Sequence, residues 1–102
     1  MFAQITSIRT PLGGMDSLRE MVVSAYLPLV RTQSGYLRAY FLEQVDDFDQ
    51  AELIVVWTSH ADYEQFRGSE AAEHVYQALR ALALRIERQG YLVRVAPPTP
   101  GT

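Results

Sequence analysis

Arginine, histidine and aromatic side chains are the groups in this sequence that could carry out chemistry. The chain has 102 residues with no cysteine, and all nine of its basic residues are arginine. Thiolate nucleophiles, cysteine-ligated metals and Schiff-base lysines are therefore excluded. Asparagine is also missing from the sequence. Acid–base work or anion stabilisation would consequently use arginine, histidine, tyrosine or a carboxylate.

Arg38 is a first candidate, because strand alternation places it on the same face as Tyr36 and Tyr40. A guanidinium in that position would lower the pKa of a bound phenol and stabilise its anion. An ion pair with Glu43 or Glu52, across strands or between subunits, would explain the same arginine without any catalysis. The sequence leaves both explanations open.

The two histidines lie apart in the sequence and share no metal-binding spacing, so we predict no metal site. His60 lies at an expected helix N-terminus, where we expect it to be exposed. His74 lies in the first turns of an expected long helix, where an imidazole could act as a general base or an axial ligand. Its place beside the apolar stripe of that helix favours a position at the solvent edge over one in a pocket.

Trp57 and several tyrosines could enclose a planar ligand. Trp57 lies in a strongly apolar segment, where it would either flank an aromatic ligand or fill the core. Tyr26, Tyr63 and Tyr76 lie in segments with a helical pattern. Their hydroxyls could donate hydrogen bonds to an oxygenated ligand, or they could be core residues with a polar tip.

Hydrophobic periodicity and turn residues define the elements that must position these side chains. Alternating or β-branched segments predict four strands, at residues 2–9, 36–45, 52–58 and 91–96. Helical spacing of apolar residues predicts three helices, at residues 15–31, 59–67 and 69–89. Pro28 should kink the first helix near Tyr26, and Ser59 and Ser69 should cap the other two. Gly90 should end the long helix.

This order of elements predicts an α+β protein with the ferredoxin-like split βαβ plan, a four-stranded antiparallel sheet with helices on one face. The opposite face would expose apolar side chains of the second and third strands. We therefore expect a second copy of the chain to cover it, giving a homodimer through the open sheet face. We expect one domain at residues 1–96 and a proline-rich C-terminal tail at residues 97–102.

Charge and hydropathy restrict the class of protein further. The net charge is −3 and no run of basic residues is present, which argues against a nucleic-acid partner. No apolar stretch approaches the roughly 18 residues of a membrane-spanning helix, so we expect no membrane partner. We expect a cytoplasmic protein.

Three local motifs resemble those of a known family. They are SGYL at residues 34–37, VVWTS at residues 55–59 and ADYEQFRGS at residues 61–69. With the order and length of the elements, they make the chain similar to the antibiotic biosynthesis monooxygenase family of dimeric α/β-barrel proteins. The resemblance implies a homodimer whose two sheets close into one barrel, with a pocket between sheet and helices in each subunit.

The resemblance also implies an activity. The family contains cofactor-independent oxygenases that convert anthrone- or quinol-like aromatics to quinones, and haem-degrading monooxygenases. The haem-degrading branch uses an Asn on the first strand, a Trp in the short helix and a His on the long helix. In this sequence asparagine is absent, and Phe66 and Tyr76 occupy the other two positions, with His74 two residues away.

We therefore expect a cofactor-independent monooxygenase that oxidises an electron-rich aromatic with dioxygen, using no metal or flavin. Arg38 or His74 would assist deprotonation of the substrate. The residues expected to enclose the ring are Trp57, Tyr40, Phe66, Tyr76 and Tyr26. Two alternatives remain: a non-catalytic dimeric α/β-barrel protein that binds a small molecule or haem, and a structural module whose cavity is filled by side chains.

Overall fold

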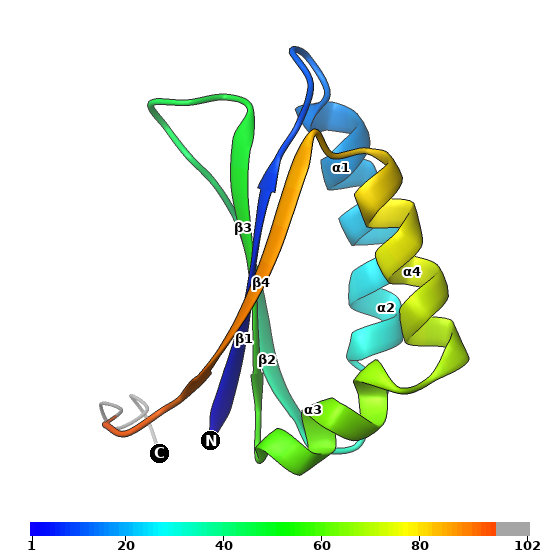
Figure 1. Cartoon of the computed structure of the whole chain (residues 1–102), viewed down its shortest axis with the longest axis vertical. Coiled ribbons are helices and arrows are strands. Elements are labelled where there is room, and N and C mark those ends of the chain that lie inside the picture. Colours follow the sequence, from blue (N-terminus) through cyan, green and yellow to red (C-terminus); the bar gives the residue numbers. More distant parts are fainter. Residues whose placement is uncertain (96–102) are drawn as a thin grey trace.

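A four-stranded antiparallel sheet carries its helices on one face in the computed structural model, which describes residues 1–95 (Figure 1). The strands are β1 (Phe2–Arg9), β2 (Tyr36–Glu43), β3 (Gln50–Trp57) and β4 (Arg85–Leu92). The helical segments are α1 (Met15–Met21), the π-helical turn η1 (Val22–Tyr26), α2 (Leu27–Val30), α3 (His60–Arg67) and α4 (Glu70–Ala81). This is the predicted ferredoxin-like fold. The predicted tail at residues 97–102 lies outside the described residues.

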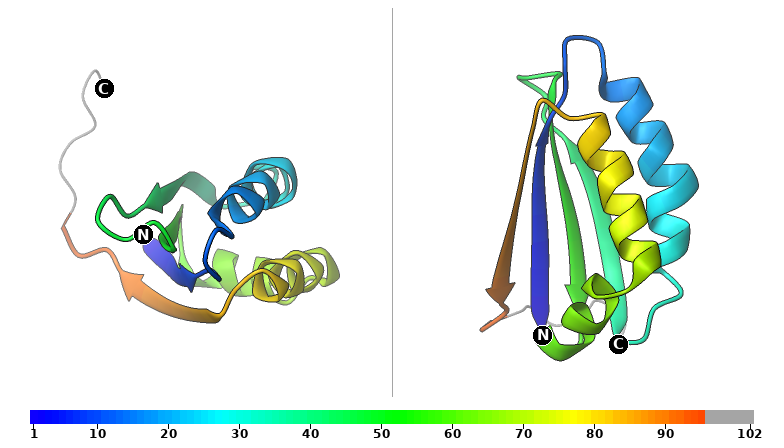
Figure 2. Two further views of the ribbon diagram at one scale, coloured as in Figure 1. Left: turned by 90° about the horizontal axis from the view of Figure 1, so that it is seen from above. Right: turned by 45° about the vertical axis from the view of Figure 1, so that its right-hand side comes forward.

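The strand order is β2-β3-β1-β4, so β1 and β3 form the centre of the sheet. Side chains of both central strands alternate strictly between buried and half-buried positions. Ile8, Leu53 and Trp57 are on the buried face, where Leu18 and Leu79 of the helices pack against the sheet layer. Figure 2 shows that the other face of the sheet carries no helix. No helix within residues 1–95 has both the length and the apolar character needed to cross a membrane.

The first helical region ends at Val30, close to the predicted end, but its irregularity differs from a simple kink. A π-helical turn occupies Val22–Tyr26, and the Leu27 N–H bonds to the Val22 carbonyl. Pro28 follows directly and has no N–H to continue the regular ladder, so the wider turn precedes the residue that interrupts it. The turn positions Tyr26 against both parts of the core.

Both predicted N-terminal caps are present. The Ser59 hydroxyl accepts a hydrogen bond from the Asp62 N–H at 3.1 Å, which begins α3. The Ser69 hydroxyl accepts from the Ala72 N–H at 3.1 Å, which begins α4. These short-range pairings fix where both helices begin and leave only a brief connection between them.

The prediction for the C-terminal end of the long helix is wrong. Helix α4 ends at Ala81, and Arg85–Leu92 forms β4 along the outer side of β1. Ile86 continues the helical spacing of the preceding apolar residues, which made the segment look helical. In the fold, pairing with β1 satisfies its backbone groups instead, so tertiary structure overrides the local pattern. Gly90 consequently lies inside a strand, opposite Gln4.

Candidate functional site

A cavity of about 530 Å³ opens between the ends of β1 and β4 and helix α3. Its lining residues are Phe2, Gln4, His60, Tyr63, Glu64, Arg67, Arg88, Gly90 and Leu92. A smaller inner cavity of about 30 Å³ adjoins it and extends to η1 and α4. The two cavities share Gln4, Tyr63, Arg67 and Arg88 in their walls. The outer cavity is in the size range of small-molecule sites, whereas the inner one has space only for a molecule about the size of water.

One wall of the outer cavity is aromatic. The Phe2 ring lies 4.6 Å from the His60 ring and 5.1 Å from the Tyr63 ring, measured between centroids. Behind this wall the Trp57 ring lies 5.3 Å from Phe66 and 6.1 Å from Tyr63. Such offset and edge contacts hold the rings in fixed orientations. A planar ligand could therefore pack against a surface that is already in place.

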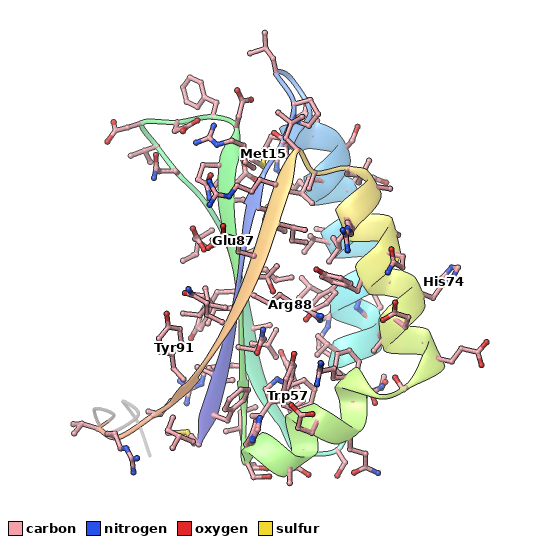
Figure 3. All side chains as sticks on the ribbon, viewed as in Figure 1. Met15, Trp57, His74, Glu87, Arg88 and Tyr91 are labelled. Carbon is pink, nitrogen blue, oxygen red and sulfur yellow. The ribbon has the colours of Figure 1, made fainter. Side chains whose placement is uncertain are left out.

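Arg88 brings a positive charge into this region from β4. It lies opposite Thr6 on the helix-facing side of the sheet, and Figure 3 shows it directed toward the helix layer. Its guanidinium carbon lies 3.8 Å from the centroid of the Tyr76 ring, a cation–π contact. Within residues 1–95 it forms no ion pair with a carboxylate. Its charge is therefore available to an anion in the cavity.

The neighbouring phenols respond to burial and to this charge. Burial raises the pKa of Tyr26, with a smaller contribution from Tyr63, and the positive charge of Arg88 opposes the rise. Burial also raises the pKa of Tyr63, against the lowering effects of Arg88 and Arg67. Both tyrosines are therefore neutral hydrogen-bond donors at neutral pH. They surround a site whose fixed charge favours an anionic ligand.

The mouth of the cavity is formed by one face of α3. Glu64 lies between His60 and Arg67: its Oε1 is 3.2 Å from His60 Nε2, and its Oε2 is 3.0 Å from Arg67 Nη1. These contacts join residues one helical turn apart. All three side chains also line the outer cavity, so the ion pair lies where a ligand would enter.

Comparison with known proteins identifies the fold and the family. The model of the family described as antibiotic biosynthesis monooxygenase matches residues 1–78, which is more than half of the chain.

The chain belongs to the antibiotic biosynthesis monooxygenase family.

Solved structures agree with this membership at the level of the fold. The cofactor-independent oxygenase SnoaB from Streptomyces nogalater, in a mutant form, has a TM-score of 0.85 at 18% identity, covering 96% of this chain and 97% of SnoaB. A candidate antibiotic biosynthesis monooxygenase from Deinococcus radiodurans has a TM-score of 0.84 at 15% identity, covering 99% and 100%. The Mycobacterium tuberculosis protein Rv0793 has a TM-score of 0.74 at 18% identity, covering 99% and 98%. No curated protein matches the chain.

In this family member, three of the seven predicted site residues line the inner cavity. They are Tyr26 from η1, Phe66 from α3 and Tyr76 from α4. Trp57 is 1% exposed and lies behind the aromatic wall, where it supports Tyr63 and Phe66. Its Nε1 is buried and has no hydrogen-bond partner among the described residues. Four of the five residues that were expected to enclose a ring therefore lie in or directly behind the walls of the two cavities.

The other three predicted site residues lie elsewhere, which corrects their expected placement. Arg38 and Tyr40 are on the open face of the sheet, because they pair with Val56 and Ile54 while Trp57 is on the opposite face. A register irregularity between Tyr36 and Arg38 places Tyr36 opposite Trp57 and separates it from the other two.

His74 is on the exposed side of α4 and is directed away from the sheet (Figure 3). It therefore lies outside both cavities. Among residues 1–95 of one subunit, Arg38 forms no ion pair with Glu43 or Glu52. Glu43 binds Arg19, and Glu52 accepts a hydrogen bond from Ser7.

Sequence reasoning missed Gln4, Arg67 and Arg88 as site residues. Arg88 was hidden because the segment that contains it was assigned to the long helix, where it would have lain at the exposed C-terminal end. Gln4 is a buried polar residue in the alternating pattern of β1, and a polar residue on the buried face of a strand is an informative observation. In the sequence, the even spacing of Gln4 from the apolar residues Phe2 and Ile8 is the signal that could have indicated its burial.

Proposed function

We propose that this family member is a cofactor-independent monooxygenase that oxidises an electron-rich aromatic, anthrone- or quinol-like, with dioxygen. The observation that supports this proposal best is the Arg88 guanidinium. It has no carboxylate partner among residues 1–95 and lies in the wall shared by both cavities, beside three phenols. A cation held in the wall of a ligand site stabilises an organic anion, and the anion is the form of such a substrate that donates an electron to dioxygen.

The reaction balances without an external reductant. An anthrone loses a proton from its methylene group, and the resulting anion transfers one electron to dioxygen to give a radical and superoxide. These combine to a peroxide anion at the same carbon. The peroxide takes up a proton, which replaces the one lost at the start, and the resulting hydroperoxide loses water to leave a carbonyl group. One oxygen atom remains in the quinone, and the other leaves as water with the two methylene hydrogens. In this scheme Arg88 stabilises the anion, and Tyr63 and Gln4, which also line the outer cavity, supply hydrogen-bond donors.

Oxygen uptake by the purified, chelator-treated protein tests the proposal. Hydroxyanthrones and quinols serve as substrates, and their autoxidation without protein is subtracted. We expect uptake above autoxidation, and Arg88→Gln should lower kcat/KM by about a hundredfold, as loss of one anion-stabilising donor does in other enzymes. Arg80→Gln is the matched control, because Arg80 is exposed on α4 and lies outside both cavities.

The variant Arg38→Ala tests whether turnover depends on the cavity that contains Arg88 or on Arg38, the residue expected from the sequence. Arg38 is on the opposite face of the sheet, so its removal should leave kcat/KM unchanged. Loss of turnover in Arg38→Ala with normal turnover in Arg88→Gln would contradict the proposed site. A flat oxygen trace with every substrate, together with ligand binding, would favour the non-catalytic binding protein instead.

We also propose that the open sheet face forms a homodimer. Ile5, Ile54 and Val56 are half-buried on this face, and Tyr40 and Leu42 of β2 are each 48% exposed beside them. A contiguous apolar surface of this kind in a small protein is typical of an interface. Light scattering during size-exclusion chromatography should give twice the chain mass. Ile54→Arg should give a folded monomer, and a monomeric wild-type protein would overturn the proposal.

A further inference from the structure

We infer that the outer cavity selects an aromatic substrate that carries a carboxylate in addition to its reacting ring, and that Arg67 binds this carboxylate. The inference rests on the proposed function only where it assumes that the aromatic ring is oxidised. The binding preference follows from the charges and contacts at the cavity mouth, and it can be measured without any turnover.

The charge of the lining is the first argument. Two arginines and one glutamate line the outer cavity, Arg67, Arg88 and Glu64, whereas the whole chain has a net charge of −3. The site is therefore locally positive in an acidic protein. Arg88 suffices to stabilise one anionic centre on the ring. A second cation at the mouth has no role toward an uncharged substituent, but it matches a second negative group.

The contacts of Arg67 are the second argument. Only Nη1 of its guanidinium contacts Glu64, at 3.0 Å. A guanidinium carries five N–H donors, so most of them remain for a ligand. One Glu64 oxygen contacts Arg67 and the other contacts His60. A single, exposed contact therefore joins Arg67 to Glu64. An incoming carboxylate can therefore bind Arg67 through its free edge or replace Glu64.

Shape favours an aryl carboxylate over a phosphate. The cavity wall next to Arg67 consists of the Phe2, His60 and Tyr63 rings, which suit a planar ligand. A planar carboxylate matches the fork of a guanidinium. A phosphate would bring up to two negative charges beside Glu64, which repels them. The ligand chemistry that fits both the wall and the charge is a hydroxylated aromatic acid.

Calorimetric titration with a matched pair of ligands tests the inference. A hydroxynaphthoic acid is compared with its primary amide, which has nearly the same size and no charge. Wild-type protein should bind the acid about tenfold more tightly than the amide, the usual effect of one charge-assisted hydrogen-bonded pair. Arg67→Gln should remove that difference, and Arg80→Gln should preserve it.

Glu64→Gln gives the sharpest result, because its effect should have the opposite sign. Removing the competing negative charge should tighten binding of the acid about threefold, and binding of the amide should not change. Both α3 positions are exposed, so the variants should fold, which thermal denaturation verifies. Equal affinity of wild-type protein for acid and amide would overturn the inference, as would weaker binding of the acid by Glu64→Gln.

The two proposals can fail separately. Preferential binding of the acid without oxygen uptake would support the carboxylate site and contradict the proposed oxygenase activity. Oxygen uptake with uncharged hydroxyanthrones, and no preference for acids in binding, would support the oxygenase activity and contradict the carboxylate site.

Discussion

Replacement of Gly90 by alanine tests the packing of β4 against the aromatic wall of the cavity. A Cβ atom at Gly90 would lie 2.6 Å from Phe2 Cζ and 2.8 Å from Phe2 Cε1. Carbon atoms in favourable contact are about 3.5–4.0 Å apart, so the overlap is about one ångström. The Phe2 ring is 6% exposed and contacts both His60 and Tyr63, so relief of the overlap would have to disturb these contacts.

The sign of the effect on stability distinguishes a clash from free space. Alanine in place of a strand glycine with free space around it stabilises a protein by about 0.4–1 kcal/mol, because the unfolded chain loses freedom. Overpacking of a core costs about 1–3 kcal/mol. We therefore expect Gly90→Ala to lower the free energy of unfolding by about 1–2 kcal/mol. For a chain of this length that corresponds to a fall in Tm of roughly 4–15 °C.

Urea denaturation followed by fluorescence measures the change, since Trp57 is the only tryptophan and is buried. All proteins are compared at one concentration, because self-association would shift the midpoint. Gly68→Ala is the control: its Cβ would meet backbone oxygens only at 3.5 and 3.8 Å, so it should be neutral or stabilising. Gly90→Ala should cost much less in a Phe2→Leu background. Stability of Gly90→Ala equal to or above that of wild type would refute the reasoning.

Three further perturbations have defined outcomes. Gly35→Ala should cost about 2–4 kcal/mol in urea unfolding, because Gly35 has a φ of 83° and its Cβ would overlap the Asp62 carboxyl group; a loss below about 1 kcal/mol would contradict this. Hydrogen bonds from Thr58 and Ser59 lower the pKa of Asp62, so stability present above the usual aspartate pKa should be lost as the pH falls through the lowered value. The urea midpoint of Asp62→Asn should show less of this acid dependence, and an unchanged dependence would exclude the cause. Burial raises the pKa of Tyr26, so stability should be lost as the pH rises above about 10, the usual tyrosine pKa. Tyr26→Phe should resist alkaline unfolding better than wild type, and an identical alkaline midpoint would exclude ionisation of Tyr26 as the cause.

The parts of the fold that were predicted correctly depend on neighbours in the sequence. Ser59 and Ser69 cap helices through contacts only three residues away, and the β-branched residues of β1 and β3 favour strands in both segments. The end of the first helical region near Val30 follows from the position of Pro28. Each of these features is decided within one or two turns of chain, so the sequence contains the information that determines it.

The parts that were missed depend on partners far away in the sequence. Whether residues 85–92 continue α4 or form a strand is decided by the free edge of β1, which no local pattern reveals. The face that Arg38 occupies is decided by a register irregularity against β3, which reverses the expected alternation after Tyr36. A shift of one residue in register moves every later side chain to the other face of the sheet. The residues of β2 that were expected at the site therefore lie on the open face of the sheet.

The pairing of β1 with β4 accounts for the composition of the proposed site. The register sets Gln4 opposite Gly90 and Thr6 opposite Arg88, so one polar and one charged side chain enter the space beneath α3 from neighbouring strands. Gly90 leaves the space that the Phe2 ring occupies, and that ring forms the cavity wall with Tyr63 of α3. A slip of one residue in β4 would turn Arg88 to the open face and replace it by Glu87 or Gln89, removing the cation on which both proposals depend. The chemistry of this site is thus determined by the register of an edge strand more than by any motif in the chain.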